Sequence, residues 1–328
     1  MSLKTGFTSA FVREASMLLR GASSSATFAF LCAAAIGCPA KSGAPGDSEA
    51  IAASASGTEE ANSKPTSAAP VTSTSASPAP APASYPGKIN GCSGEMVRVE
   101  GEYCPALMQN CLEHHSEFES LKGKTKTVSE RCVLYESPSR CVSKKRKYSS
   151  FCMDRFEYPN KLGEKPRVLT SWTHAKKLCE GVGKRLCTED EFNFACEGPD
   201  MLPYVYGFKR DKNVCNIDKD YRYPDHSKVM LEYDECLLEP WCKAEIERLD
   251  QREPIGQRTS CVSWAGVYDL NGNANEWVEI PKEKPPNRSG LKGGWWGPVR
   301  GRCRPTVTFH KESDYGYEAG FRCCTDAK

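Results

Sequence analysis

Hydrophobic residues recur at helical spacing in two short segments near the middle of the chain. In the first segment Trp172, Ala175 and Cys179 share one face, a Ser or Thr precedes them as an N-cap, and two glycines end the run. The second segment begins at Thr188, where Thr-Glu-Asp-Glu allows the Thr hydroxyl to bind the amide of Glu191 while the Glu191 side chain reaches back. The pattern predicts one helix in each segment.

Extended segments with alternating apolar residues are few. The string Met96-Val-Arg-Val99, followed by Gly101, predicts a strand and a turn. The apolar string that begins at Phe151 predicts a second strand, in the segment 151–160. Between residues 200 and 262 the pattern is irregular and predicts only a short helix near its end, at residues 244–249. The chain is therefore predicted to be an α+β protein with little regular secondary structure.

The first 91 residues have a different character from the rest. Residues 1–38 combine basic residues with a short apolar run, too short to span a bilayer, and end in Ala-Ile-Gly-Cys38, which resembles a bacterial lipobox although Ala35 replaces the usual leucine. We predict a signal peptide, lipidation of Cys38 and a place in the bacterial cell envelope, in the periplasm or on the outer membrane; ordinary secretion is the alternative. Residues 39–91 are rich in Ala, Ser and Pro and predict a flexible tether, which leaves residues 92–328 as one domain.

Charge and cysteine content narrow the class of protein. The net charge of +2 gives no reason to expect nucleic-acid binding. Of the 18 cysteines, all but Cys32 and Cys38 lie in residues 92–324, an even number that predicts a disulfide framework formed in an oxidising compartment. The string Cys104-x6-Cys111-x2-His-His115 is also compatible with a zinc site, but disulfides are the favoured interpretation in an exported chain.

Three strings near the C-terminus carry a family resemblance. They are GVYDLNGNANEW at 266–277, LKGGWW at 291–296 and GFRCC at 320–324. Together with the two helical segments, they resemble the formylglycine-generating enzymes, or sulfatase-modifying factors, whose members oxidise a sulfatase cysteine with a copper-binding pair of cysteines. The resemblance implies a single sulfatase-modifying-factor domain, related to C-type lectins and rich in disulfides.

The resemblance also assigns roles to particular cysteines. It implies the disulfides Cys179–Cys323 and Cys196–Cys303, because these positions match the family's structural pairs. Pro298 stands four residues past Gly294, where active members carry the first copper cysteine. Cys303 lies five residues further on and is the remaining candidate for a catalytic thiol, but the resemblance gives it a structural partner. Copper(I) in this chemistry needs two thiolates held close together, so copper is not expected here.

The family carries structural calcium, and two sets of residues match its ligands. The first set contains Asn271 and Gly272, for which a simple tight turn between strands is the alternative interpretation. An acid in a packed region needs a cation, and backbone carbonyls with one carboxylate are the hard ligands that calcium takes. The first set is Asn271, Gly272, Ala274 and Glu276, and the second is Asn216, Ile217, Asp250 and Arg252.

The functional prediction combines these points. The chain is predicted to be an exported, lipid-anchored monomer that lacks the copper pair and serves as a non-catalytic binding or structural module, with an envelope protein or peptide as its partner. It touches the membrane only through its lipid anchor. The rival is an active oxidoreductase that makes formylglycine, or oxidises another substrate, with a diverged site. A sugar- or peptide-binding role, by analogy with lectin-like folds, is a third hypothesis.

Overall fold

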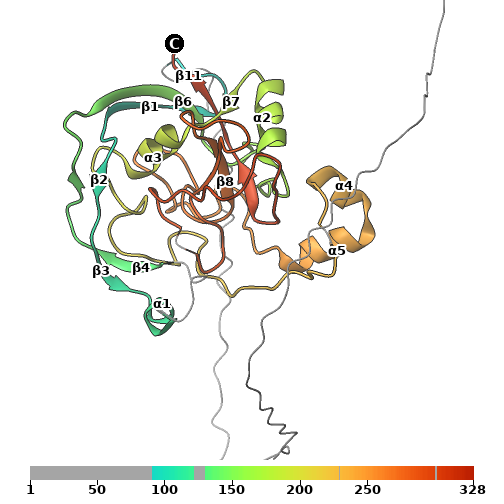
Figure 1. Ribbon diagram of the computed structural model, residues 1–328. Coiled ribbons are helices and arrows are strands. Elements are labelled where there is room, and N and C mark those ends of the chain that lie inside the picture. The colour runs from blue at the N-terminus through green and yellow to red at the C-terminus, as the bar shows by residue number, and fades with distance from the viewer. Residues whose placement is uncertain (1–90, 122–129, 229, 300) are drawn as a thin grey trace, which may run out of the picture. The chain divides into compact units, whose positions relative to one another are not determined.

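The computed structural model describes residues 91–121, 130–228, 230–299 and 301–328 (Figure 1). All of these lie within one compact unit that begins at Ala76. The signal peptide, the lipidation of Cys38 and nearly all of the tether fall outside the described residues and stay predictions. Within the described part of the chain, no helix is both long enough and apolar enough to cross a membrane.

The largest sheet has four antiparallel strands, in the order β1, β6, β11, β7. The predicted strand at Met96 is confirmed, but it continues past Gly101 to Tyr103 because residues 96–103 pair along their whole length with β6. The strand predicted over 151–160 ends earlier, because the Asn160 side chain accepts a hydrogen bond from the Phe156 amide and closes a turn. The bounds are β1 Met96–Tyr103, β6 Lys147–Asp154, β7 Arg185–Leu186 and β11 Cys323–Asp326.

A second sheet has three strands, which include parts of the three C-terminal strings that carry the family resemblance. Its central strand β8 runs parallel to β10 and antiparallel to β9. Because Gly320 pairs with Glu276 in a parallel register, β10 lies beside the first three residues of β8. The bounds are β8 Asn275–Glu279, β9 Ser289–Lys292 and β10 Ala319–Phe321. Two further ribbons pair β2 Leu107–Met108 with β5 Arg140–Cys141, and β3 Cys111–His114 with β4 Cys132–Tyr135.

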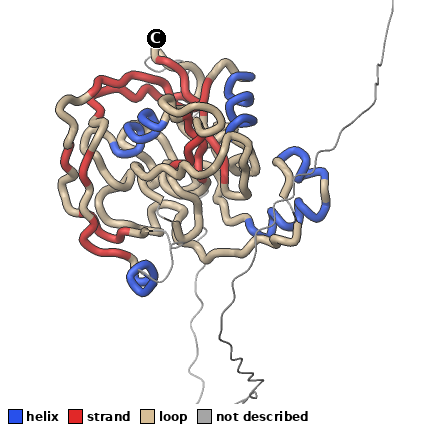
Figure 2. Tube along the Cα trace, in the orientation of Figure 1, coloured by secondary structure: helices blue, strands red, loops and turns tan. Residues whose placement is uncertain are grey.

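Both predicted central helices are present, with the expected caps. In α2 (Trp172–Gly181) the Ser171 side chain accepts from the His174 amide, and α3 (Glu189–Glu197) begins with the full capping box of Thr188 and Glu191. The helix predicted at 244–249 is longer, because Pro240 provides a favourable first turn. Loops make up most of the remaining chain (Figure 2). The other helices are α1 Ser116–Leu121, α4 Tyr233–Leu238 and α5 Pro240–Leu249.

Each of the two central helices packs against strands of both sheets. In α2, Trp172 packs with Trp277 and Phe321 of the three-stranded sheet. In α3, Phe192 and Phe194 pack with the four-stranded sheet, in the larger core cluster. Burial of such aromatic side chains stabilises the fold by about 1.5–3 kcal/mol each. The helices therefore hold the two sheets in place around the C-terminal strings.

Candidate functional site

All cysteines from Cys92 to Cys324 are paired in disulfides. The pairs Cys179–Cys323 and Cys196–Cys303 are those that the family resemblance implies. The proposed zinc cysteines are also bonded, and His114 instead contacts Glu130 at 3.1 Å, so no thiolate is left for zinc there. The remaining six disulfides are Cys92–Cys152, Cys104–Cys141, Cys111–Cys132, Cys187–Cys324, Cys215–Cys261 and Cys236–Cys242.

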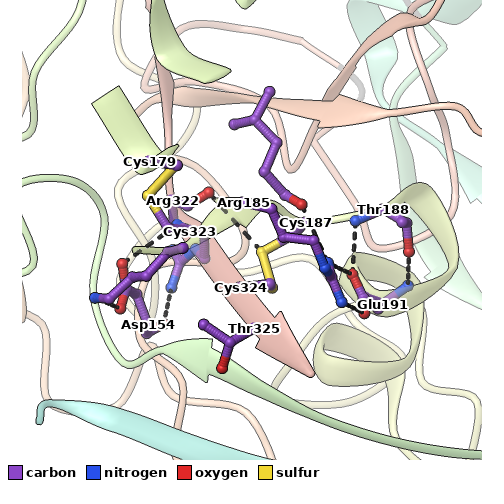
Figure 3. Close-up of a disulfide and its surroundings, with 12 residues drawn as sticks. Asp154, Cys179, Arg185, Cys187, Thr188, Glu191, Arg322, Cys323, Cys324 and Thr325 are labelled. Atoms are coloured by element: carbon purple, nitrogen blue, oxygen red, sulfur yellow. Dashed lines mark hydrogen bonds and ion pairs between the residues drawn. A yellow bond between two sulfur atoms is a disulfide. The ribbon is translucent and has the colours of Figure 1, made fainter. Parts of the chain in front are cut away.

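The adjacent cysteines of the C-terminal string form a double link, which we call the C-terminal clamp (Figure 3). Cys323 joins α2 through Cys179, and Cys324 joins the segment after β7 through Cys187. Beside them the Asp154 carboxylate accepts from the Cys323 amide and from Lys184. Burial raises the pKa of Asp154, and the Lys184 ammonium opposes this shift. The sequence predicts half of the clamp, since the Cys187–Cys324 pair has no counterpart in the resemblance.

The segment Gly293–Arg304, which we call the C-terminal loop, is where the family resemblance leads us to expect the copper cysteines. Its one cysteine, Cys303, is bonded to Cys196 on α3 and is fully buried. Gly294 has φ +82°, and a Cβ at this position would lie 2.4 Å from the Cα of Gly301. The two glycines therefore allow the loop to fold back on itself at close range. This close approach accounts physically for the short segment between Gly294 and Cys303.

A cavity of about 550 Å³ opens beside the C-terminal loop, with Pro298 in its wall. Two nearly buried guanidinium groups share one carboxylate there: Arg210 donates to Asp218 at 2.7 and 3.0 Å, and Arg131 at 3.3 Å. Burial acts to raise the pKa of Asp218, but the hydrogen bonds from Arg210 hold it below its ordinary value. Arg210 also donates to the Val299 carbonyl at 2.7 Å, so this network holds the loop in position.

The cavity continues into a second one, of about 480 Å³. The two share lining residues on the segment 218–220, so we treat them as lobes of one cleft. Lys212 and Lys219 line both lobes, together with Asp218 and Asp220. The cleft therefore presents charges of both signs. Sequence reasoning missed it, because its residues come from segments far apart in the chain.

The first calcium set lies in the turn before β8 and at the start of that strand, but its carboxylate already has a cation. Both oxygens of Glu276 accept from Arg322 at 2.6 Å, and both side chains are 1% exposed. The Asn271 side chain accepts from the Val205 amide. Gly272 and Ala274 supply only backbone groups. The guanidinium provides the positive charge that calcium was expected to bring, so this set does not fit calcium as it is arranged.

The second calcium set is also brought together, since the Asn216 amide donates to the carbonyl of Gln251, between Asp250 and Arg252. The Asp250 carboxylate accepts from Arg252 at 2.7 Å and from Lys165 at 2.7 Å. Burial acts to raise the pKa of Asp250, but hydrogen bonds from Arg252 lower it. Two cations therefore neutralise this acid. Ile217 is buried beside it, and the set offers one unused buried oxygen, on the Asn216 side chain. With no carboxylate left without a cation, it does not fit a calcium ion as it is arranged.

A buried amide network that the sequence did not indicate connects the two sets. Asn273 donates from its backbone to the Asn216 carbonyl at 2.9 Å and from its side chain to Glu157 at 2.7 Å. Glu157 is 1% exposed and also accepts from the Ala274 amide. Burial raises the pKa of Glu157 well above its ordinary value, and the neighbouring Asp269 adds to the effect. This network fixes the Asn-rich turn by hydrogen bonds within the protein.

Comparison with known proteins identifies relatives of the domain. The model of the sulfatase-modifying factor enzyme 1-like domain matches residues 111–327, more than half of the chain. CarF, known from a crystal structure, has 13% sequence identity to this chain and a TM-score of 0.43, and the match covers 71% of this chain and 98% of that chain. PvdO from Pseudomonas aeruginosa is 15% identical, with a TM-score of 0.40, and the match covers 74% and 99%. Treponema denticola variable protein 1 is 11% identical, with a TM-score of 0.34, and the match covers 70% and 99%.

Proposed function

The chain belongs to the sulfatase-modifying factor enzyme 1-like family, and we propose that it is a non-catalytic binding module of the bacterial cell envelope. The observation that carries the proposal is the disulfide between Cys303 and Cys196, on a loop that has Pro298 in place of the other copper cysteine. Formylglycine generation by a copper dithiolate needs two free thiolates. The cysteines of residues 92–324 are all bonded to one another, so they supply none.

The charged cleft supports a binding role. It lies beside the C-terminal loop, where an active member would place its reacting cysteines, and in it both Arg131 and Arg210 donate to Asp218. Clefts of this size accommodate a peptide segment or a small molecule. Charges of both signs favour a polar partner, because they steer and orient complementary groups. We propose an envelope protein or peptide as that partner.

The position of the domain's N-terminus supports the anchored arrangement. Gly91 lies next to the C-terminus, since a Cβ on Gly91 would be 3.1 Å from the Lys328 carbonyl oxygen. The cleft is lined by His115 and Glu117 at the start of α1, and Figure 1 shows α1 at the end of the domain away from the C-terminus. Eight disulfides fit an exported protein. An anchor that joins the domain through residue 91 would therefore leave the cleft open to a partner.

The test is a turnover and metal-binding experiment on the purified mature protein. It is incubated with copper(I), oxygen and a cysteine peptide taken from a sulfatase, and the products are analysed by mass spectrometry. We expect no formylglycine and no tight copper(I) binding, while a copper-loaded formylglycine-generating enzyme assayed in parallel converts the peptide. Formation of formylglycine by this chain would overturn the proposal in favour of the rival oxidoreductase.

A matched variant checks whether the disulfide alone blocks copper chemistry. Cys196→Ser releases the thiol of Cys303 but leaves Pro298 in place. We expect this variant to gain one labelled thiol and still to bind copper(I) weakly, because one thiolate cannot form a dithiolate site. Tight copper binding by the variant would indicate a second soft ligand nearby and would contradict the proposal.

A further inference from the structure

Arg302 is the exceptional charged residue of the C-terminal loop. It is half-buried, and its Nε is fully buried without a hydrogen-bond partner. Over the ranges that the structure covers, Arg302 makes no ion pair and no hydrogen bond, and its close contact is with the ring of Tyr135, 5.1 Å from the guanidinium carbon. Its neighbour Arg304 differs, since it pairs with the buried Glu197 at 2.5 Å.

Tyr135 adds a second unused polar group at the same place. The side chain is 2% exposed, and its hydroxyl is buried without a hydrogen-bond partner. The acids nearby are already engaged: Glu130 contacts His114, and Asp218 accepts from Arg131 and Arg210. Arg302 and Tyr135 are therefore neighbouring side chains, and each has a hydrogen-bond donor for which the described part of the protein offers no acceptor.

Two unused donors of this kind are costly in the free protein. An arginine stays charged at any physiological pH, and burying part of that charge without a counter-ion is unfavourable. Burial lowers the pKa of Arg302, with Glu130 opposing the shift. A buried hydroxyl without a partner costs about 1–3 kcal/mol. Unpaired groups of this kind are explained when a ligand supplies the missing acceptor.

We propose that Arg302 and Tyr135 bind a carboxylate of the module's peptide partner, an inference that rests on the proposed binding function. A guanidinium presents two parallel N–H groups that match the two oxygens of a carboxylate, and the phenol can donate a third hydrogen bond. Tyr135 and Arg302 do not line the cavity themselves, but Val133 and Pro298, which precede them by two and four residues, do. A peptide held by its carboxylate at this point can continue into the cleft.

The first test measures thermal stability in acetate, used as a minimal carboxylate probe. The midpoint of unfolding is compared in sodium acetate and in sodium chloride at equal ionic strength, for the wild type and for Arg302→Met. We expect acetate to raise the wild-type Tm by roughly 2–4 °C, as about 1 kcal/mol of stabilisation does in a domain of this size, and to leave the variant unchanged. In chloride the variant should be at least as stable as the wild type, because the unpaired charge has been removed.

Arg140→Met provides the matched control, because Arg140 is exposed and lies on β5. This control should retain the full acetate response, and Tyr135→Phe should show a reduced one. An acetate effect that is equal in the wild type and in Arg302→Met, or absent from both, would overturn the carboxylate site. Such a result would leave the proposed function standing, because that rests on the copper and formylglycine measurements.

The second test separates the two sources of a carboxylate. Three labelled Gly-Ser peptides are compared: one with a central Glu and an amidated end, one with Gln and a free C-terminus, and one with Gln and an amidated end. We expect one of the first two to bind more tightly than the third, and Arg302→Met to weaken that binding about tenfold or more. The identity of that peptide tells whether a side chain or a chain end is bound. Equal binding of all three peptides would contradict the inference.

Discussion

The C-terminal clamp and the C-terminal loop lie close in sequence, yet they differ in whether the buried polar side chains around them have partners. Around the clamp, Asp154 is paired with Lys184, and Glu276 with Arg322. Around the loop, Arg302 and the Tyr135 hydroxyl have no partner within the described residues. A scaffold is most stable when its buried polar groups are satisfied, whereas a binding site keeps some of them for its ligand. This difference distinguishes the clamp, which stabilises the fold, from the loop, which we propose takes part in binding.

The largest effect is expected at the clamp. Its two disulfides close loops of 144 and 137 residues, but each keeps the other's loop closed. Removing one pair, as in Cys187→Ala with Cys324→Ala, should cost only about 3 kcal/mol, because the extra ring that it closes has roughly ten residues. Removing both pairs should cost about 6–7 kcal/mol, because Cys196–Cys303 still shortens the opened loop to about 40 residues, and should leave the domain unfolded or nearly so. Guanidinium unfolding curves measure the loss of stability on removing one disulfide. A single-pair variant that fails to fold would show that one disulfide of the clamp cannot replace the other.

The next effect is expected at the buried ion pair. Arg322→Met leaves the Glu276 carboxylate buried without its cation, which should cost about 3–5 kcal/mol of stability. Adding Glu276→Gln to that variant should recover much of the loss, because no buried charge remains. Urea unfolding of the two single variants and the double variant measures the coupling. Additive losses would mean that the two side chains do not depend on each other.

A smaller effect depends on pH. Burial lowers the pKa of Lys292 to about 7, from an ordinary value of 10.5. At a pH between these two pKa values, Lys292 is protonated in the unfolded chain and neutral in the folded chain, so stability rises with pH. The contribution of Lys292 should be up to about 1.4 kcal/mol per pH unit from pH 7 to pH 9. Lys292→Met should lose this slope; equal slopes in the wild type and the variant would show that Lys292 does not titrate in this range.

The smallest effect is expected from calcium. The acids of both calcium sets are neutralised by Arg322, Arg252 and Lys165. A calcium ion at a hundred times its Kd would add about 2.7 kcal/mol of stability. We expect no such change, so the Tm in excess calcium should equal the Tm in a chelator. A rise in calcium would show that one of these ion pairs yields to the metal, and would restore the calcium site that the family resemblance implies.

Local signals predicted the fold better than the site. The capping box of Thr188 and Glu191 depends on four consecutive residues, and the helix that it predicts is confirmed. The partner of Glu276 is 46 positions away and comes beside it only because β10 pairs with β8, which no local pattern indicates. The contact of Arg302 with Tyr135 likewise joins distant segments. Sequence reasoning could not tell which side chains of the loop would lack a partner.

The most direct measurement is the state of the cysteines in the native protein. The mature chain is unfolded without reductant, alkylated, digested and mapped by mass spectrometry. The disulfide framework predicts no alkylated cysteine from Cys92 to Cys324, and a linked peptide that joins Cys196 to Cys303. Alkylation of Cys303 together with a second cysteine would contradict the account, since a pair of free thiols is what copper chemistry requires.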